Sequence, residues 1–253
     1  KQFNGNIATI TINQRTIANA NGGCQSSRVP ITFIDENWNK EKRIIEFNGL
    51  TSTQNIILNI NPINCFVDLE EEIADATIDN YKTIAGTGRQ DFPNTYFYAN
   101  VKNNPDSIFI RTTLHWVGNE EDNPLPDGIN RLSQKHYWTI EGEGLEKCEI
   151  EGNFYFKILS GVNNFDNALI SKYSSLDSLI LLYRPNKETE WIAVKTSRPN
   201  NTEGYLTLNS LWEGDYIMGV GDLNTIGIAN IEQNSPKMKI YPNPAKESIN
   251  INF

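Results

Sequence analysis

Short stretches in which apolar and polar residues alternate dominate the chain. In residues 7–12, Ile10 and Ile12 point to one side, and Thr9 and Thr11 point to the other. An alternation with a period of two is typical of a β-strand with one buried face. Three more strands of this kind, each bounded by Asn, Gly, Pro or Asp, are predicted at residues 29–34, 44–47 and 56–60. Four short strands at this spacing predict a first β-sandwich.

A second series of strands begins near residue 81. The strand at residues 108–117 follows a strong turn signal, Asn-Asn-Pro-Asp, at residues 103–106. Its alternation predicts one face with Ile108, Ile110, Leu114 and Trp116, and an opposite face with Phe109, Arg111, Thr113 and His115. We expect Trp116, Trp138 and Tyr183 to be buried in this second sandwich.

The remaining strands are predicted at residues 96–101, 136–141, 149–158, 178–183, 190–195, 205–208 and 215–220. Residues 179–183 do not alternate, which is typical of a central strand covered on both faces. Residues 68–76 form a short stretch without a clear apolar face, so loop and strand are expected there rather than a helix. The prediction is an all-β chain of two tandem immunoglobulin- or fibronectin-like sandwiches, at residues 1–80 and 81–228. Residues 229–253 form a linker and the beginning of one more β domain.

Composition narrows the class of protein. The chain has 253 residues, with 22 Lys and Arg against 31 Asp and Glu, so its formal charge is −9 and its isoelectric point is about 4.8. An acidic chain without a basic stripe lacks the charge that phosphate backbones require, which argues against nucleic-acid binding. No apolar run is long enough for a transmembrane helix. The 34 Asn and 31 Ile suggest an AT-rich genome.

Motifs that identify a catalyst are missing from the sequence. The two histidines, His115 and His136, are far apart and do not have metal-ligand spacing. The sequence contains no H-E-x-x-H, no phosphate-binding glycine loop and no G-x-S-x-G. We therefore predict neither catalytic residues nor a metal or other cofactor for this chain.

Three cysteines, Cys24, Cys65 and Cys148, leave two alternatives open. Cys24 and Cys65 lie in the first sandwich and could form a disulfide if the protein is exported; otherwise all three are buried thiols. The chain begins at Lys1 without an initiator Met or a signal peptide, so we expect a processed protein or a fragment.

The segment Tyr241-Pro242-Asn243-Pro244-Ala245-Lys246 is the most specific feature of the sequence. Its two prolines fix two φ angles and remove two backbone donors, so it must be extended. With the alternating Ile249 and Ile251 behind it, the segment resembles the opening of the type A sorting domain of the type IX secretion system of Bacteroidetes. The resemblance implies export to the medium or the outer cell surface of a Gram-negative bacterium. It makes Tyr241, Pro242, Asn243, Pro244 and Lys246 the sorting signal, and the secretion machinery the partner.

The family's domain continues for several more strands, whereas this sequence ends at Phe253. We therefore expect that the chain alone is not competent for sorting.

A second resemblance covers most of residues 1–222. Features at residues 136–142, 177–184, 204–208 and 213–216 resemble the C-terminal β region of secreted gluzincin, or aminopeptidase N-like, metallopeptidases. The order Val29-Pro30-Ile31, Asn61-Pro62, Phe66-Val67-Asp68 is similar to the sandwich that follows the catalytic domain in that family. The family's zinc ligands and catalytic Glu would precede Lys1, and no residue here matches them.

Other candidate sites each have two interpretations. His115 is either a ligand contact or a half-exposed sandwich residue. His136, Tyr137, Trp138, Trp191 and Trp212 either form a sugar-stacking platform or fill the core. Glu120, Glu121, Asp122 and Asp127 offer oxygen ligands for calcium, although acidic solvated loops are common.

The favoured function is a non-catalytic C-terminal β region of a larger exported protein, with a gluzincin-like metallopeptidase as the parent and the upstream domain as a packing partner. The alternative is a carbohydrate-binding or adhesive module, in which exposed aromatic residues of the second sandwich carry the interaction.

Overall fold

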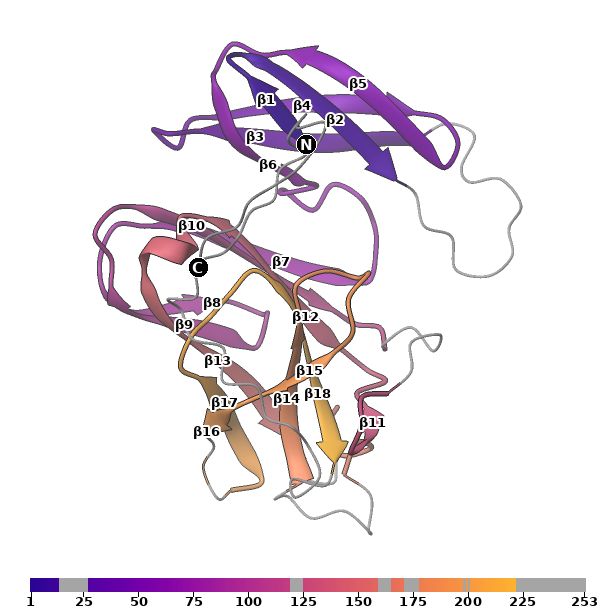
Figure 1. Cartoon of the computed structure of the whole chain (residues 1–253), viewed down its shortest axis with the longest axis vertical. Helices are drawn as coiled ribbons and strands as arrows, with labels where there is room; N and C mark the ends of the chain where they lie inside the picture. The colour runs from indigo at the N-terminus through magenta and orange to yellow at the C-terminus, as the bar shows by residue number, and fades with distance from the viewer. Residues whose placement is uncertain are drawn as a thin grey trace, which may run out of the picture.

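The computed structural model describes residues 1–13, 27–118, 125–158, 165–170, 178–197, 199 and 201–221. Within these ranges the chain is all-β, as predicted: the only helical element is a 3-10 turn, η1, at Leu145–Lys147. No helix in the described ranges is both long and apolar enough to cross a membrane. Figure 1 shows a smaller sandwich, drawn in indigo and purple, above a larger one.

The smaller sandwich consists of two three-stranded antiparallel sheets. One sheet has the order β1-β2-β5, with bounds Gln2–Asn4, Ile7–Asn13 and Thr51–Ile57. The other has the order β4-β3-β6, with bounds Lys40–Phe47, Ser27–Asp35 and Pro62–Val67. The predicted alternation of β2 is confirmed: Ile10 is buried in the core with Phe33 and Leu58, whereas Thr9 and Thr11 form hydrogen bonds on the exposed face.

The larger sandwich packs a seven-stranded sheet against a five-stranded sheet. The seven-stranded sheet contains β7 (Thr77–Ile84), β10 (Ile108–His115), β11 (Ile129–Leu132), β12 (Tyr137–Glu143), β14 (Leu179–Arg184), β15 (Ile192–Val194) and β18 (Gly214–Gly221). The five-stranded sheet has the order β16-β17-β13-β9-β8, with bounds Thr196–Ser197, Glu203–Leu208, Glu149–Lys157, Phe97–Asn103 and Gly88–Phe92. Trp138, Phe154, Phe156 and Tyr216 are fully buried between the two sheets.

Strand β14 confirms the prediction of a strand covered on both faces, because all six of its residues are buried. Leu179, Leu181 and Tyr183 face the core between the sheets. Ile180 and Leu182 belong to a second apolar cluster on the outer side of the sheet, together with Ile129, Leu132, Tyr137, Trp191, Ala193 and Ile217. A strand with apolar neighbours on both sides loses the alternation of a half-buried strand.

The faces predicted for residues 108–117 are correct inside the strand and wrong at its end. Ile108, Ile110 and Leu114 lie in the main core, and Phe109 lies in a separate cluster on the opposite face. Trp138 and Tyr183 are buried as expected, but the prediction that Trp116 is buried is wrong, since it is 36% exposed. Strand β10 ends at His115, so the alternation of the strand no longer determines where Trp116 points.

The junction between the sandwiches is made by residues 68–76, which contain turns but no helix or strand. The carboxylate of Asp68 accepts hydrogen bonds from the backbone N–H groups of Glu72 (2.8 Å) and Ile73 (2.9 Å), which fixes the turn. Strand β7 crosses the boundary predicted at residues 80 and 81, and pairs with β10 along its whole length from Thr77 to Ile84. The second sandwich therefore begins at Thr77.

Candidate functional site

An aromatic cluster joins the two sandwiches. Phe109 on β10 is 1% exposed, and its ring lies 4.8 Å from that of Phe66 on β6 and 5.5 Å from that of Tyr81 on β7. Trp38, in the turn after β3, stacks on Phe109 at 6.2 Å. Trp38 has a φ of 65°, and the Asp35 carboxylate stabilises this turn by accepting hydrogen bonds from Asn37 and Asn39. Phe109 thus contacts aromatic rings from both sandwiches.

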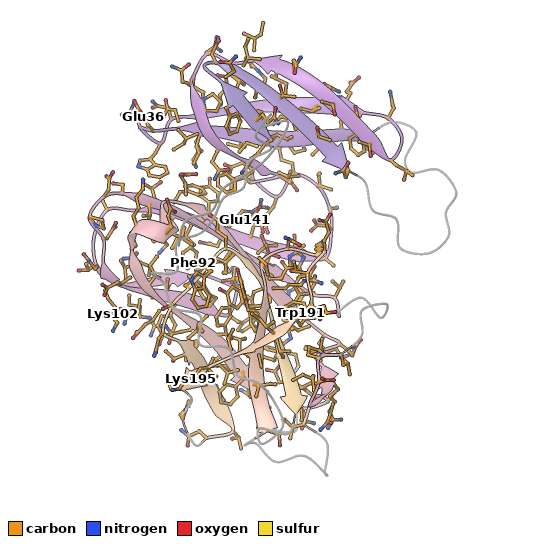
Figure 2. All side chains as sticks on the ribbon, in the orientation of Figure 1. Glu36, Phe92, Lys102, Glu141, Trp191 and Lys195 are labelled. Atoms are coloured by element: carbon orange, nitrogen blue, oxygen red, sulfur yellow. The ribbon has the colours of Figure 1, made fainter. Side chains whose placement is uncertain are left out.

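Polar groups flank this cluster and bridge the same junction. Arg111, 6% exposed, donates to the carbonyl of Val67 (2.6 Å) and forms ion pairs with Asp79 and Glu141. The amide nitrogen of Asn64 donates to the Gly142 carbonyl (2.9 Å) and to the Glu143 carboxylate (3.0 Å). Glu141 is labelled at the junction in Figure 2. Apolar packing and directional hydrogen bonds together fix the orientation of the sandwiches.

His115 lies on the outer face of the seven-stranded sheet, stacked on Tyr137 with 4.1 Å between ring centroids. The Thr139 hydroxyl donates its single proton to Asp215 (2.6 Å), so Nε2 of His115 must donate to Thr139 Oγ1 (2.9 Å). Asp215 also forms a buried ion pair with Arg184 (2.8 Å). Burial lowers the pKa of His115 to about 4, against the opposing attraction of Asp215. His115 is therefore a neutral member of a structural hydrogen-bond network.

His136 and Asp166 form a second buried pair, with His136 Nε2 at 3.6 Å from Asp166 Oδ1. Neither side chain is exposed, and neither ring nitrogen of His136 has a hydrogen-bond partner within the described ranges. Burial lowers the pKa of His136 to about 4 and raises the pKa of Asp166 to about 7, so both groups favour their neutral forms. Phe165 packs edge-on against His136 at 4.9 Å and also lines a pocket of about 240 Å³.

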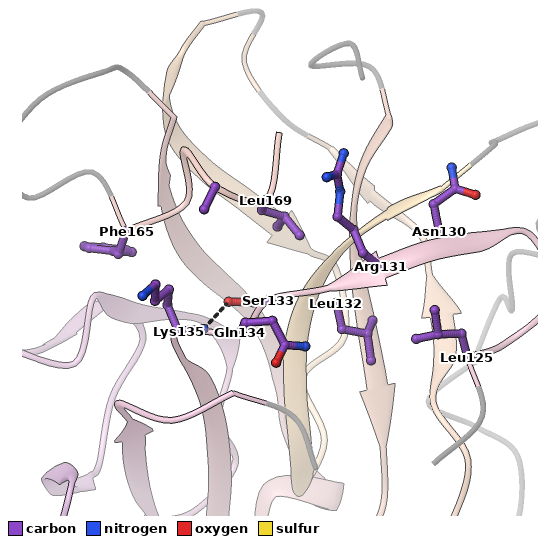
Figure 3. A pocket seen from close by; sticks show the side chains of 10 residues that line it. Leu125, Asn130, Arg131, Leu132, Ser133, Gln134, Lys135, Phe165 and Leu169 are labelled. Carbon is purple, nitrogen blue, oxygen red and sulfur yellow. Dashed lines mark hydrogen bonds between the residues drawn. The ribbon is translucent and has the colours of Figure 1, made fainter. Parts of the chain in front are cut away.

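Figure 3 shows this pocket between Ser133, Gln134 and Lys135 on one side and Phe165 and Leu169 on another. The Ser133 hydroxyl accepts a hydrogen bond from the backbone N–H of Lys135 (3.3 Å), which shapes the turn that forms the pocket wall. Among the described residues that line the pocket there is no carboxylate, histidine or cysteine. Leu132, Phe165 and Leu169 give the pocket an apolar wall, and Ser133, Gln134 and Lys135 supply hydrogen-bonding groups.

The tryptophans proposed for a sugar-stacking platform are core residues. Trp191 and Trp212 are 3% and 9% exposed, and His136, Tyr137 and Trp138 are equally buried. Trp191 lies under the guanidinium of Arg184, 4.3 Å from its carbon, and Trp212 is held by hydrogen bonds between its backbone and the Tyr216 hydroxyl. Of the two interpretations of Trp191 and Trp212, the one in which they fill the core agrees with their burial.

Half-buried aromatic rings that face outward are found instead on the outer face of the five-stranded sheet. Tyr98 (β9), Tyr155 (β13) and Tyr205 (β17) point away from the core on three neighbouring strands. The rings of Tyr98 and Tyr205 lie 4.8 Å apart across β13, and Tyr205 lies 5.5 Å from Tyr155. Asn153, between them on β13, is only 3% exposed. We call these three residues the tyrosine face.

The tyrosine face continues into three further rings at the edge of the sheet. Tyr96, 40% exposed, stacks on Tyr155 at 5.6 Å and contacts Phe165 at 5.1 Å and Trp116 at 6.0 Å. Phe165 and Trp116 meet edge to face at 5.5 Å. We call the complete set the aromatic band: Tyr98, Tyr205, Tyr155, Tyr96, Phe165 and Trp116. It leads from the open sheet face to the pocket at Phe165.

A strained turn between β8 and β9 presents Tyr96. Asn94 and Tyr96 both have positive φ, 64° and 54°, which is costly for residues with a Cβ. The turn is held from below: the indole N–H of buried Trp138 donates to the Thr95 carbonyl (2.7 Å), and the backbone N–H of Tyr155 donates to the Tyr96 carbonyl (3.0 Å). The core therefore fixes the position of an exposed ring.

Charged residues around the tyrosine face are paired with one another. Arg89 with Asp91 (2.7 Å), Lys102 with Glu151 (3.1 Å) and Lys157 with Glu203 (3.3 Å) give three cations and three anions, so their charges sum to 3 − 3 = 0. The Arg89 guanidinium also lies 3.9 Å from the Tyr98 ring centroid. Tyr155 donates to Glu203 (2.5 Å), and this bond, with Lys157, holds the pKa of Glu203 below its ordinary value. Lys102 is labelled in Figure 2.

Several predicted residues lie outside the described ranges: the sorting residues Tyr241, Pro242, Asn243, Pro244 and Lys246, the loop residues Glu120, Glu121 and Asp122, and Cys24. The structure describes Asp127 as exposed and Cys65 as a half-buried free thiol. Within the described part of the chain, no group of three His, Cys, Asp or Glu side chains is arranged to hold a metal ion.

The sequence contains the signal for the tyrosine face. In β9, β13 and β17 the buried positions Ala99, Phe154 and Leu206 each have a tyrosine as a direct neighbour, which alternation places outside. The sequence interpretation placed a stacking platform on aromatic residues near loop ends. The tyrosine face lies instead in the middle of strands β9, β13 and β17.

The chain was compared with protein-family models, curated proteins and solved structures. No protein-family model, no curated protein and no solved structure matches the chain.

Proposed function

We propose that the chain is the non-catalytic C-terminal β region of a larger exported protein, with a gluzincin-like metallopeptidase as the parent. Its role is to hold two sandwiches in one fixed orientation between the upstream domain and the segment that directs secretion. The observation that supports a fixed orientation most strongly is the junction, where Phe109 contacts rings from both sandwiches.

A fixed spacer needs a junction that resists bending, and three features meet this requirement. The aromatic cluster excludes water, Arg111 and Asn64 bond across the junction, and the connecting turn is tied to the second sandwich through the Tyr81 hydroxyl, which donates to Glu70 (2.7 Å). Domains joined only by a polar linker move relative to each other by default. A buried apolar contact of this kind supports a rigid two-domain unit.

Export is supported by the resemblance of Tyr241–Lys246 to the opening of a type IX sorting domain. The test compares the full-length protein in its own host with a version that ends at Gly221. We expect the shortened version to stay in the periplasm while the full-length protein reaches the medium or the cell surface. Equal export of the two versions would refute the sorting assignment.

The gluzincin-like parent is tested by the sequence upstream of Lys1. We expect an H-E-x-x-H motif followed by a distal Glu, the ligand set of a helical zinc site. An upstream region without this motif would refute the metallopeptidase parent and leave the spacer role intact.

The second candidate function, a carbohydrate-binding or adhesive module, is favoured by one specific observation. The aromatic band places six rings on the side of the second sandwich, with Tyr96 and Trp116 each more than a third exposed. Large aromatic side chains normally contribute their area to a core or to an interface.

A further inference from the structure

We propose that the tyrosine face and the aromatic band around it bind an uncharged polysaccharide. This inference rests on the second candidate function and names its site and its ligand class. It is independent of the spacer role, which concerns the opposite side of the second sandwich.

The rings provide the surface that a pyranose ring requires. A sugar has a face of C–H groups that packs on an aromatic ring and a rim of hydroxyl groups that need hydrogen-bond partners. Tyrosine offers both an apolar ring and a polar edge. Tyr98 and Tyr205 meet edge to face at 4.8 Å, and Tyr205 and Tyr155 meet edge to face at 5.5 Å, so the three rings form one continuous apolar strip across three strands. The Arg89 guanidinium covers one face of Tyr98, so a linear chain of sugars contacts ring edges and the remaining ring faces along this strip.

Polar side chains lie beside these rings on the same three strands. The Asn100 amide donates to Glu151 (3.0 Å) and the Thr207 hydroxyl donates to Asn153 (2.8 Å). Each group keeps hydrogen-bonding capacity: the Asn100 carbonyl oxygen and the lone pairs of the Thr207 hydroxyl still accept. A ligand rich in hydroxyl groups matches this pattern of donors and acceptors.

The site is formed before the ligand arrives. Tyr96 is held in a left-handed conformation by hydrogen bonds from Trp138 and Tyr155 to its turn, so its ring position is set by the core. Strained backbone of this kind persists only where the surroundings enforce it, and it gathers at ligand sites. Preorganised rings lose little conformational entropy on binding.

Charge decides between ligand classes. Stacked aromatic rings on a sheet also suit single-stranded nucleic acid, but that ligand requires cations free to meet phosphates. Here Arg89, Lys102 and Lys157 are each paired with a carboxylate of the same face. The three ion pairs of this face carry no net charge, while the chain as a whole carries −9. Because the cations of this face are paired and the chain is acidic, a neutral ligand is favoured over a polyanion or a charged peptide.

A protein partner fits this face less well. The side chains that point outward on its five strands are charged groups, amides, hydroxyls and tyrosines, and none of them is aliphatic. The centre of a protein interface is depleted of charged side chains, whereas ion pairs surround the tyrosines here. Aromatic rings set among polar groups are the pattern of a sugar site.

Affinity electrophoresis of the intact chain tests the proposal directly. The gels contain hydroxyethylcellulose, galactomannan, xyloglucan or soluble starch as neutral probes, and alginate or oligothymidylate as anionic probes. We expect retardation by at least one neutral polysaccharide and by neither anionic probe. Tyr155→Ala and Tyr205→Ala should each weaken that binding by about tenfold, since one stacked ring contributes on that scale. Tyr155→Phe, which keeps the ring, should weaken it by less than about threefold.

The matched control is Ile57→Ala, which removes a 71% exposed apolar side chain from the first sandwich and should leave retardation unchanged. Circular dichroism checks that each variant is folded. As a second readout, the tryptophan fluorescence of the chain should change on titration with the retarding polysaccharide, and Trp116→Phe should reduce that change.

Three results would overturn the proposal: no retardation by any neutral probe, retardation by oligothymidylate or alginate instead, or equal retardation of wild type and both alanine variants. None of these results bears on export or on the junction, so failure here is distinguishable from failure of the spacer role.

Discussion

The two outer faces of the second sandwich differ in how much of the described chain packs on them. The outer face of the seven-stranded sheet is covered: Phe109 and Arg111 lie under the first sandwich, and Ile180 and Leu182 lie under Trp191 and its neighbours. Among the described residues, no other layer packs on the outer face of the five-stranded sheet, which we call the open face and which presents the half-buried Tyr98, Tyr155 and Tyr205. Both faces have an aromatic residue pointing outward from an alternating strand. What differs is that, within the described ranges, other parts of the chain pack on one face only.

The charges on the two faces show the same contrast. Arg111 with Asp79 and Arg184 with Asp215 are buried ion pairs on the covered face, with side chains no more than 8% exposed. Arg89 with Asp91 on the open face is more than half exposed. Breaking a buried pair leaves an uncompensated charge, whereas an exposed pair is screened by water. The covered face therefore contributes more to the free energy of unfolding. The side chains of the open face contribute less to it, so they can bind a ligand without loss of stability.

The largest effect is expected from Phe109→Ala on the covered face. The change removes the ring that both sandwiches contact, so the free energy of unfolding should fall by about 4 kcal/mol, within the range for buried aromatic residues. Calorimetry should then resolve two transitions where the wild type shows one. The matched variant on the open face, Tyr155→Ala, should cost less than about 1.5 kcal/mol. Equal losses in the two variants would remove the distinction between the faces.

A smaller effect, about 3 kcal/mol, is expected from Arg111→Ala, because Asp79 then stays buried without a partner. Arg89→Ala breaks the Asp91 pair on the open face and should cost less than about 1 kcal/mol. Urea denaturation of both variants measures the difference. A loss below about 1 kcal/mol for Arg111→Ala would mean that water reaches Asp79 and that the junction is not closed.

Acid should destabilise the covered face through His115. Its pKa is about 4 in the folded chain and 6.5 when unfolded, so the unfolded state binds the proton first. The contribution of His115 to the free energy of unfolding is fully present above pH 6.5 and is lost as the pH falls towards 4. Because the side chain is half-buried, we expect the loss to be about 2 kcal/mol. His115→Gln, which still donates to Thr139, should flatten this part of the profile. Identical profiles of the variant and the wild type would contradict the burial of His115.

The sequence predicts which side chains share a face but not which face will be covered. Alternation is a property of one strand, so it placed Ile10 against Thr9, and Phe109 against Ile110, correctly. Whether Phe109 or Tyr155 meets another layer depends on contacts between strands far apart in the chain, which a local pattern does not contain. Trp116 was misplaced for a related reason: the alternation was extended one residue beyond the end of β10.

Candidate sites were harder to predict than the fold. Trp191 and Trp212 were candidates for a sugar site because tryptophan stacks well on sugars. The largest apolar rings also bury the most area in a core, so the residue type alone does not distinguish the two roles. Tyr98, Tyr155 and Tyr205 are separated in sequence, and only the strand order β17-β13-β9 brings them together. The Tyr241–Lys246 signal was found by resemblance alone and stays a prediction.

Hydroxyl-radical footprinting with mass spectrometry tests most directly whether the open face is free and binds a neutral polysaccharide. We expect rapid oxidation of Tyr96, Tyr98, Tyr155 and Tyr205 in the free chain, and protection of these rings when the retarding polysaccharide is added. Tyr216, fully buried, should stay unreactive throughout. Slow oxidation of the four tyrosines in the free chain, or oxidation that the polysaccharide leaves unchanged, would contradict the account.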